Sequence, residues 1–269
     1  MKALIVGLGS MGKRRIRLLR GIDKNAEIIG VDTNPERRAQ VEEMGCKTYR
    51  TIEEAAAEKP EAAFVCTSPV AHYPIIKDLL SYKINTFTEL NLVSDGYEEL
   101  MSAAKENNTV LFLSSTMLYR GEINYIQNRV KNFDKPVSYI YHIGQYLPDW
   151  HPWESYKNFF VSNKRTNGCR ELFGIELPWI IETFGKIKEI YSTADKMTDL
   201  EIDFPDRFFV TITHENGTKG ILAIDVVIVK NTSGTITTNN RFKNMSPKGC
   251  NIVAFSWNII PTIAPTIIA

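Results

Sequence analysis

The first part of the chain alternates between two patterns of hydrophobic positions. Continuous apolar runs predict strands at Ala3–Val6, Glu27–Val31, Ala62–Cys66, Asn85–Thr88 and Val110–Ser114. Apolar residues spaced three or four apart predict helices at Met11–Arg20, Glu36–Met44, Ile52–Glu58, Tyr73–Leu80 and Tyr97–Glu106. Strands that are buried on both sides are apolar throughout, and the runs ALIV and AAFVC meet that condition. The alternation predicts an α/β domain with a doubly wound parallel sheet.

The pattern changes after about Leu118. The predicted elements are helices at Ile123–Val130 and from about Asn167 to Phe184, and strands at Val137–Leu147, Arg207–Thr213 and Thr218–Val227. The last two strands flank Glu215-Asn216-Gly217, which is a strong hairpin turn signal. We therefore expect two domains, residues 1–117 and residues 118–269, the second of α+β type with a mainly antiparallel open sheet.

Residues 229–269 have an atypical composition for a folded domain. From Val226 to the end there is no Asp or Glu, and no side chain beyond Lys248 is charged. The segment is rich in Ile, Thr and Asn, as in IIPTIAPTIIA. Two interpretations stay open: a buried or interface segment, or a sequence that has lost its original reading frame.

Composition excludes several classes of protein. The chain has 269 residues, of which 43% are hydrophobic and 23% charged, and its formal net charge is +1, so neither a nucleic acid nor a membrane is expected as a partner. Four basic residues, Arg14, Arg15, Arg17 and Arg20, form a cluster for which we favour a solvated helix face over a polyanion site. The cysteines are scattered without a C-x-x-C pair, which argues against a metal site and against disulfides. With no signal peptide and no long apolar run, a cytoplasmic location is expected.

A glycine motif gives the first domain its chemistry. Gly7-Leu8-Gly9-Ser10-Met11-Gly12 is G-x-G-x-x-G, and it directly follows a predicted strand and opens a predicted helix, which is the context of a dinucleotide-binding Rossmann domain. Gly7 permits the tight turn, Gly9 the close approach of a diphosphate, and Gly12 the packing of helix on strand. The free N–H groups of Ser10, Met11 and their neighbours at the helix N-terminus favour an anion.

Asp32 bears on the choice of cofactor. It lies at the end of the second predicted strand, twenty residues after Gly12, where a carboxylate accepts hydrogen bonds from the adenosine ribose. The same carboxylate repels a 2′-phosphate, which favours NAD, whereas the nearby Arg37 and Arg38 keep NADP open. Thr33, beside Asp32, is expected to line the same part of the site.

Two further segments carry a resemblance to a known family: the strand end Cys66-Thr67-Ser68-Pro69, with His72 shortly after, and Phe87-Thr88-Glu89. With the glycine motif and Asp32, they make the chain resemble the glucose–fructose oxidoreductase / inositol dehydrogenase / MocA (Gfo/Idh/MocA) family. The first segment is similar to the family's turn beside the nicotinamide ribose, and the second is similar to the start of its Glu-Lys-Pro element. The resemblance implies cofactor contacts from Thr67, Ser68, Pro69, His72 and Glu89. It also implies a second domain that binds substrate and forms a homodimer or homotetramer.

The chain departs from that family at its catalytic positions. Leu90 stands where the family has the lysine that supports hydride transfer. An alignment counted back from Phe184-Gly185 places Glu171 at the family's helical aspartate and Ile175 at its histidine. Glu176 follows, but on a helix it points about 140° away from Glu171 and so is no simple replacement.

Three residues remain as candidate bases for the removal of a hydroxyl proton: His151, Glu171 and Glu176. His151 lies in a loop that resembles one of sugar-acting family members, in which Trp150, Trp153 and Tyr156 are equally compatible with stacking on a sugar and with simple packing. The leading hypothesis is an NAD(P)-dependent oxidoreductase of a sugar, an amino or nucleotide sugar, or a polyol. The alternative is a catalytically degenerate dinucleotide- or sugar-binding protein on the same scaffold.

Overall fold

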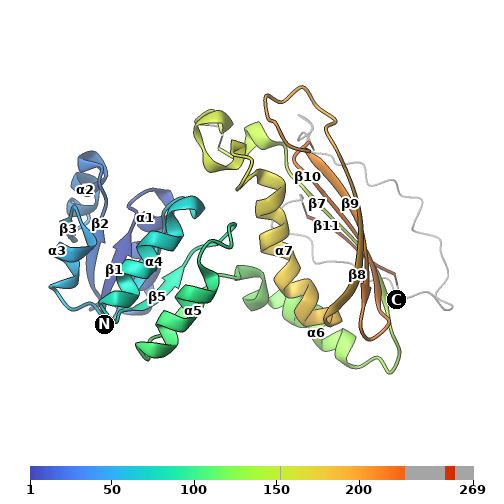
Figure 1. Ribbon diagram of the computed structural model, residues 1–269, viewed down its shortest axis with the longest axis horizontal. Coiled ribbons are helices and arrows are strands. Elements are labelled where there is room, and N and C mark those ends of the chain that lie inside the picture. The colour runs from blue at the N-terminus through green and yellow to red at the C-terminus, as the bar shows by residue number, and fades with distance from the viewer. Residues whose placement is uncertain (152, 228–251, 258–269) are drawn as a thin grey trace. The chain divides into compact units, whose positions relative to one another are not determined.

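The computed structural model describes residues 1–151, 153–227 and, as backbone, 252–257. The chain divides into two compact units, Met1–Ser114 and Ser115–Ala269 (Figure 1). Within the described residues, no helix has the length and apolar character that crossing a membrane requires.

The first unit is built on a six-stranded sheet in which every pairing is parallel. Its strands are β1 (Lys2–Val6), β2 (Glu27–Val31), β3 (Lys47–Tyr49), β4 (Ala62–Val65), β5 (Asn85–Thr88) and β6 (Leu111–Leu113). Their order across the sheet is β3-β2-β1-β4-β5-β6, with Val6 between Val31 and Val65 in register. The predicted doubly wound Rossmann sheet is confirmed. The short β3 was not predicted, because its sequence KTY carries no apolar run.

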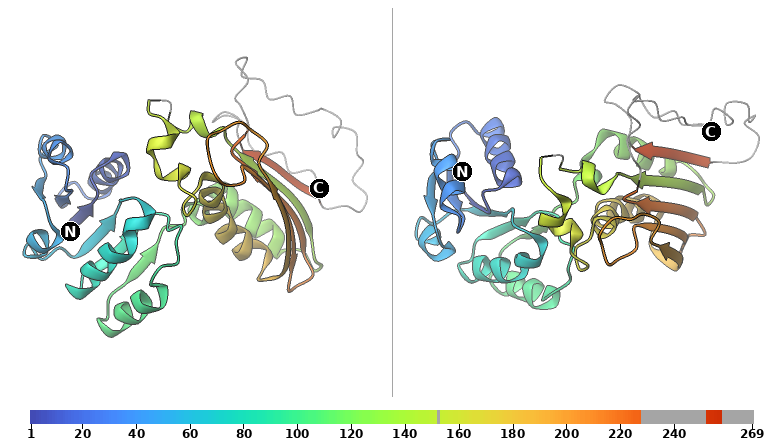
Figure 2. Two further views of the ribbon diagram at one scale, coloured as in Figure 1. Left: turned by 45° about the horizontal axis from the view of Figure 1, so that its top comes forward. Right: turned by 90° about the horizontal axis from the view of Figure 1, so that it is seen from above.

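Helices cover both faces of this sheet (Figure 2). They are α1 (Ser10–Ile22), α2 (Pro35–Glu42), α3 (Ile52–Ala56), α4 (His72–Ser81) and α5 (Tyr97–Glu106). One core cluster joins alternate β1 residues, such as Ile5, to Ile16 of α1 and Val41 of α2. The other joins the remaining β1 residues, such as Leu4, to α3, α4 and α5. Burial on both faces explains why the central strands are apolar throughout.

The second unit combines two helices with a mixed, open sheet. The helices are α6 (Gly121–Lys131) and α7 (Gly168–Phe184), and the strands are β7 (Ser138–Gly144), β8 (Ile187–Asp195), β9 (Arg207–His214), β10 (Lys219–Asp225) and β11 (Ile252–Trp257). Short 3-10 turns lie at Pro69–Ala71 in the first unit and at Thr116–Tyr119, Leu147–Asp149, Tyr156–Asn158 and Phe160–Ser162 in the second. The sheet order is β11-β7-β10-β9-β8.

The sheet of the second unit contains both antiparallel and parallel strand pairs. β9 is antiparallel to both β8 and β10, and the predicted hairpin turns at Gly217 with a φ of +87°. The α+β domain with a mainly antiparallel open sheet is therefore confirmed for β8, β9 and β10. β7 adds parallel pairings with β10 and β11, which periodicity along one strand cannot reveal because pairing direction depends on the connection.

Only one face of this second sheet is covered by the described helices. Alternate residues of the strands, among them Tyr141, Val210 and Leu222, pack with α6 and α7 into one hydrophobic core. On the opposite face Ile140, Phe209 and Ile221 have 44%, 48% and 45% of their surface exposed. Figure 2 shows α6 and α7 lying along the same side of the sheet. Of the atypical residues 229–269, Ile252–Trp257 form β11, an edge strand parallel to β7, and the others lie outside the described residues.

Candidate functional site

The glycine loop follows β1 and leads directly into α1. Gly7 has a φ of +93°, a backbone conformation that favours glycine, and its N–H donates to the carbonyl oxygen of Val31 at 2.8 Å. A Cβ on Gly12 would lie 2.0 Å from the carbonyl oxygen of Gly7, so no other residue fits there. A Cβ on Gly9 would meet nothing within 4 Å, which leaves the space above the loop open to a ligand.

The first turn of α1 is suited to an anion. Gly9 is the N-cap and offers no side chain to cap the helix, and the first turn, which includes Ser10 and Met11, contains no acidic residue. The N–H groups of such a turn have no partner within the helix, and the helix dipole adds positive charge there. Because space, free donors and positive potential coincide, the loop fits the diphosphate of a dinucleotide.

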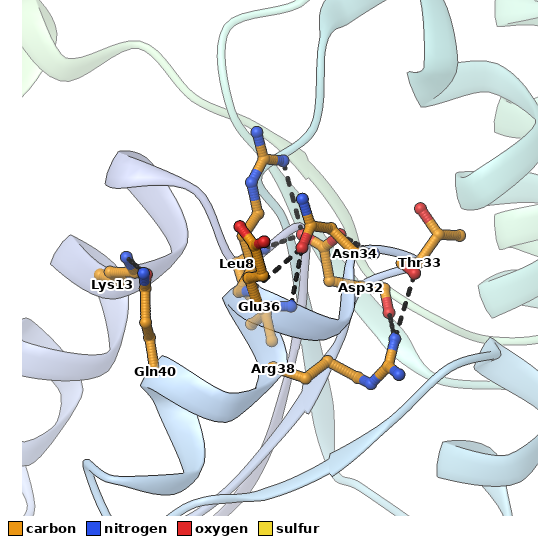
Figure 3. Close-up of polar contacts among 9 residues, drawn as sticks. Leu8, Lys13, Asp32, Thr33, Asn34, Glu36, Arg38 and Gln40 are labelled. Atoms are coloured by element: carbon orange, nitrogen blue, oxygen red, sulfur yellow. Dashed lines mark hydrogen bonds and ion pairs between the residues drawn. The ribbon is translucent and has the colours of Figure 1, made fainter.

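Asp32 joins the end of β2 to the glycine loop (Figure 3). Its Oδ2 accepts a hydrogen bond from the N–H of Leu8 at 2.8 Å, and its Oδ1 accepts one from the N–H of Asn34 at 2.9 Å. Each carboxylate oxygen can accept a second bond, so the group retains capacity for a ribose hydroxyl. Asn34 in turn caps α2 through its side chain, which fixes the turn that carries Asp32.

The basic residues beside Asp32 differ in their surroundings. Arg38 donates from its Nη1 to the carbonyl oxygens of Asp32 and Thr33 at 2.7 and 3.2 Å, so it is occupied in holding the turn (Figure 3). Arg37 is more exposed, and its Nη1 lies 3.7 Å from Oδ2 of Asp32. Thr33 is exposed on the same turn. Of the two arginines, Arg37 is therefore the better placed to reach a ligand at Asp32.

His72 braces the segment that follows β4. The side chain is fully buried, with its Nε2 3.0 Å from the carbonyl oxygen of Thr67 and its Nδ1 3.2 Å from Oγ1 of Thr88. Burial lowers the pKa of His72, so the ring is neutral and its Nε2 carries the proton that the carbonyl accepts. The ring thus fixes the turn of Thr67, exposed Ser68 and buried Pro69, where Oγ1 of Thr67 is buried without a hydrogen-bond partner.

Glu89, at the end of β5, is held by a residue whose role the sequence did not reveal. Its Oε1 accepts a hydrogen bond from Nε of Arg15 at 2.5 Å, and the Arg15 guanidinium lies 4.8 Å from the centre of the Phe87 ring. The solvated-face interpretation of the basic cluster is therefore wrong for Arg15, whereas Arg17 is exposed. Helical spacing was the missed signal, because Arg15 lies three residues after Gly12 and four before Leu19, both of which are buried.

The two glutamates of α7 occupy different environments in the second unit. Oε2 of Glu171 is buried without a hydrogen-bond partner, and burial raises the pKa of this carboxyl to about 7. Oε2 of Glu176 accepts hydrogen bonds from the Tyr141 hydroxyl at 2.9 Å and from Nε1 of Trp179 at 2.5 Å. Burial also raises the pKa of Glu176. Glu171 therefore has an unused acceptor, while Glu176 is engaged in the core.

His151 is fixed in an aromatic stack. Its ring stacks on Phe159 at 4.1 Å and on Trp153 at 5.0 Å between centroids, and its Nδ1 lies 2.8 Å from Oε1 of Glu154. Trp153 is 74% exposed. Trp150 donates from Nε1 to the carbonyl oxygen of Gln145 at 3.0 Å. Tyr156 accepts a hydrogen bond from the Glu201 N–H. Of the three aromatic residues considered for stacking, Trp153 is thus the one that the loop leaves most exposed.

A comparison with protein families identifies the first unit. Residues 1–115 match the Gfo/Idh/MocA model, described as an oxidoreductase family with an NAD-binding Rossmann fold. The match covers the first unit and less than half of the chain, and it shows that this unit has the Rossmann fold of the family's NAD-binding domain. The predicted resemblance is confirmed. No relative was found among curated protein sequences.

Solved structures extend the likeness of fold into the second unit. The WlbA dehydrogenase of Bordetella pertussis, in complex with NADH and UDP-GlcNAcA, has a TM-score of 0.74 at 13% identity over 84% of this chain and 71% of its own. GenD2 from gentamicin A biosynthesis, in complex with NAD, has a TM-score of 0.69 at 18% identity over 86% of this chain and 67% of its own. The UDP-N-acetylglucosamine 3-dehydrogenase GnnA of Acidithiobacillus ferrooxidans has a TM-score of 0.68 at 18% identity over 85% and 70%.

Proposed function

We propose that this protein is an NAD-dependent oxidoreductase that oxidises a secondary hydroxyl of a sugar, with a nucleotide sugar or amino sugar as the preferred class. The observation that carries the proposal is the buried Glu171 carboxyl, which has an unpartnered oxygen and a pKa of about 7, in a chain whose first unit matches an NAD-binding Rossmann domain. A group with that pKa exchanges protons readily at neutral pH.

The first unit supplies the residues that would hold NAD. The glycine loop and the first turn of α1 bind the diphosphate, Asp32, Thr33 and Arg37 face the adenosine ribose, and the brace at His72 shapes the turn on the nicotinamide side. Bound there, NAD supplies an acceptor for a hydride from the substrate carbon. This assignment leaves the removal of the hydroxyl proton to the chain itself.

Glu171 is our choice for the base. As a carboxylate it takes the hydroxyl proton while the carbon loses its hydride, so that the alcohol becomes a ketone and the carboxyl becomes protonated. Glu176 is less suited, because Tyr141 and Trp179 already donate to its carboxylate. His151 is less suited as well, because Glu154 and two flanking rings fix its position.

The substrate class rests on the aromatic loop and on the solved structures of similar fold. Trp153 exposes an indole ring that is backed by His151 and Phe159, an arrangement suited to stacking on a sugar face. Among the solved structures of similar fold, one dehydrogenase is in complex with UDP-GlcNAcA and another is a UDP-N-acetylglucosamine 3-dehydrogenase. Nucleotide sugars are therefore the first compounds to test, followed by amino sugars and polyols.

The test is NADH formation, followed by absorbance across a panel of UDP-sugars, amino sugars and inositols. We expect turnover whose rate rises with pH through about 7, because Glu171 must lose its proton to act. Glu171→Gln should reduce the rate by roughly 10²–10⁴-fold. Glu182→Gln, an exposed glutamate on the same helix, should leave it unchanged. Brisk turnover in Glu171→Gln that is lost in His151→Ala or Glu176→Gln would assign the base elsewhere.

The second candidate function is a dinucleotide- or sugar-binding protein without catalysis. The observation that favours it is the pair Leu90 and Ile175, neither of which can exchange a proton, at the positions where the family resemblance places lysine and histidine. That function predicts tight NAD binding with no NADH formation from any member of the panel. Turnover that depends on Glu171 would exclude it.

A further inference from the structure

Arg15 crosses from α1 to the end of β5. Its Nε donates to Oε1 of Glu89 at 2.5 Å, its guanidinium lies 4.8 Å from the Phe87 ring centre, and its side chain is only 21% exposed. Glu89 is 14% exposed, so the ion pair is largely shielded from water. A shielded, charge-assisted hydrogen bond fixes both partners more firmly than a surface pair does.

The strand order places this ion pair at a specific part of the cofactor site. In a doubly wound sheet the dinucleotide lies across the carboxyl ends of the strands, with the diphosphate at the first helix. Asp32 follows β2 on one side of β1, and Glu89 follows β5 on the other side. The adenosine half of NAD thus belongs with Asp32, and the nicotinamide half belongs with Glu89.

Within the described part of the chain, the Glu89 side chain has one charged group and one thiol as its hydrogen-bond partners. Its neighbour Leu90 is uncharged, the Cys66 thiol lies 4.0 Å from Oε1, and Arg15 is the cation that bonds to it among the described residues. Burial, followed by the Glu89 charge, raises the pKa of Cys66 to about 12, so the thiol stays neutral. Without Arg15, the carboxylate would therefore stand uncompensated beside the nicotinamide half of the site.

We propose that Arg15 is a positioning residue for the nicotinamide half of NAD, which fixes the Glu89 carboxylate and balances its charge from α1. Because Leu90, the next residue after Glu89, carries no charge, the cation that contacts Glu89 comes from another element, α1. The inference rests on the proposed function in so far as NAD is the ligand. It concerns binding, and so holds whether or not the protein turns over a substrate.

The experiment compares ligands that fill the whole site with one that fills half of it. Affinities for NAD, NADH and ADP are measured by calorimetry for the full chain and for Arg15→Gln, Arg15→Lys, Glu89→Gln and Arg17→Gln. We expect Arg15→Gln to lower the affinity for NADH roughly tenfold, because a charge-assisted hydrogen bond is lost. The affinity for ADP should change less than about twofold. The affinity for NAD should fall less than the affinity for NADH, because the positively charged nicotinamide ring of NAD tolerates the unpaired Glu89 carboxylate.

The other variants separate positioning from mere folding. Arg15→Lys keeps the charge and should restore part of the NADH affinity, and Arg17→Gln, exposed on the same helix, should change nothing. Equal losses for ADP and NADH in Arg15→Gln, or no loss for either, would overturn the inference while leaving the proposed cofactor intact. A full chain that binds neither NADH nor ADP would overturn both.

Discussion

The hydroxyl of Tyr141 on β7 donates a hydrogen bond of 2.9 Å to Oε2 of Glu176 on α7, and Nε1 of Trp179 donates to the same oxygen. The three side chains are buried together in the hydrophobic core of the second unit. One carboxylate thus accepts hydrogen bonds from two donors that are buried away from water. This ties the covering helix to the sheet and assigns Glu176 a part in the fold that its neighbour Glu171 does not share.

Removing the Glu176 carboxylate should destabilise the protein. Glu176→Ala leaves the Tyr141 hydroxyl and the Trp179 N–H without an acceptor, and we expect a loss of roughly 2–4 kcal/mol in the free energy of unfolding by urea. Glu176→Gln keeps an acceptor oxygen and should lose less. The affinity for NADH should stay the same in both variants. Equal stability of Glu176→Ala and the unchanged protein would contradict this role.

Glu171 should make stability depend on pH in a defined direction. Burial raises its pKa from 4.5 to about 7, so the folded state holds the proton more tightly than the unfolded state does. Its contribution is therefore most favourable below pH 4.5 and is lost as pH rises to about 7. Above that range Glu171→Gln should be more stable than the unchanged protein by roughly 1–3 kcal/mol, with little difference near pH 4. Urea unfolding at several pH values, with Glu182→Gln as the control, measures the difference.

Asp32 should make the protein prefer NAD to NADP. Its carboxylate can accept a hydrogen bond from a ribose hydroxyl but would repel a 2′-phosphate, so calorimetric titration should give tighter binding of NAD than of NADP. Asp32→Ala should reduce the difference in affinity between NAD and NADP, mainly by weakening the binding of NAD. Tighter binding of NADP by the unchanged protein would show that Arg37 outweighs Asp32.

The face of the second sheet that the described helices leave uncovered should join copies of this chain. Ile140, Phe209 and Ile221 are about half exposed there, and such a face is stabilised by burial against another surface. We expect a dimer or tetramer in light scattering at micromolar concentration. Ile221→Lys should shift it toward the monomer, while Lys188→Gln, on the exposed edge strand β8, should not. A monomeric unchanged protein would refute this prediction.

Periodicity predicted the architecture better than the site. The apolar strands of the first unit and the turn at Gly217 depend on local sequence, so their elements could be read directly. Pairing direction could not, since β7 is parallel to β10 across a long connection. The strand β8 was also missed, because it is exposed along nearly its whole length and lacks the alternation of a half-buried strand.

The candidate site divides in the same way, into features that depend on local sequence and features that depend on contacts between distant segments. The glycine loop lies between β1 and α1, and Asp32 directly follows β2, so local sequence was enough to predict the place of both. The pair Arg15 and Glu89 is separated by 74 positions, and only the sheet brings it together. Sequence also could not rank Glu171 and Glu176, because whether Tyr141 reaches one or the other is a matter of three-dimensional packing.

The bond between Asp32 and the N–H of Leu8 has a consequence for redesign of cofactor specificity. Asp32, which we propose as the residue that selects the ribose, also holds the glycine loop in place through Leu8, so a substitution that alters ribose recognition would also alter the diphosphate site. A substitution at position 32 that removes the acceptor for the Leu8 N–H would change cofactor selectivity and would also make the glycine loop less rigid. Asp32→Asn, which removes the charge and keeps an oxygen for Leu8, is the substitution with which to begin an NADP-accepting variant, and the neighbouring Thr33 and Arg37 are the positions at which to continue.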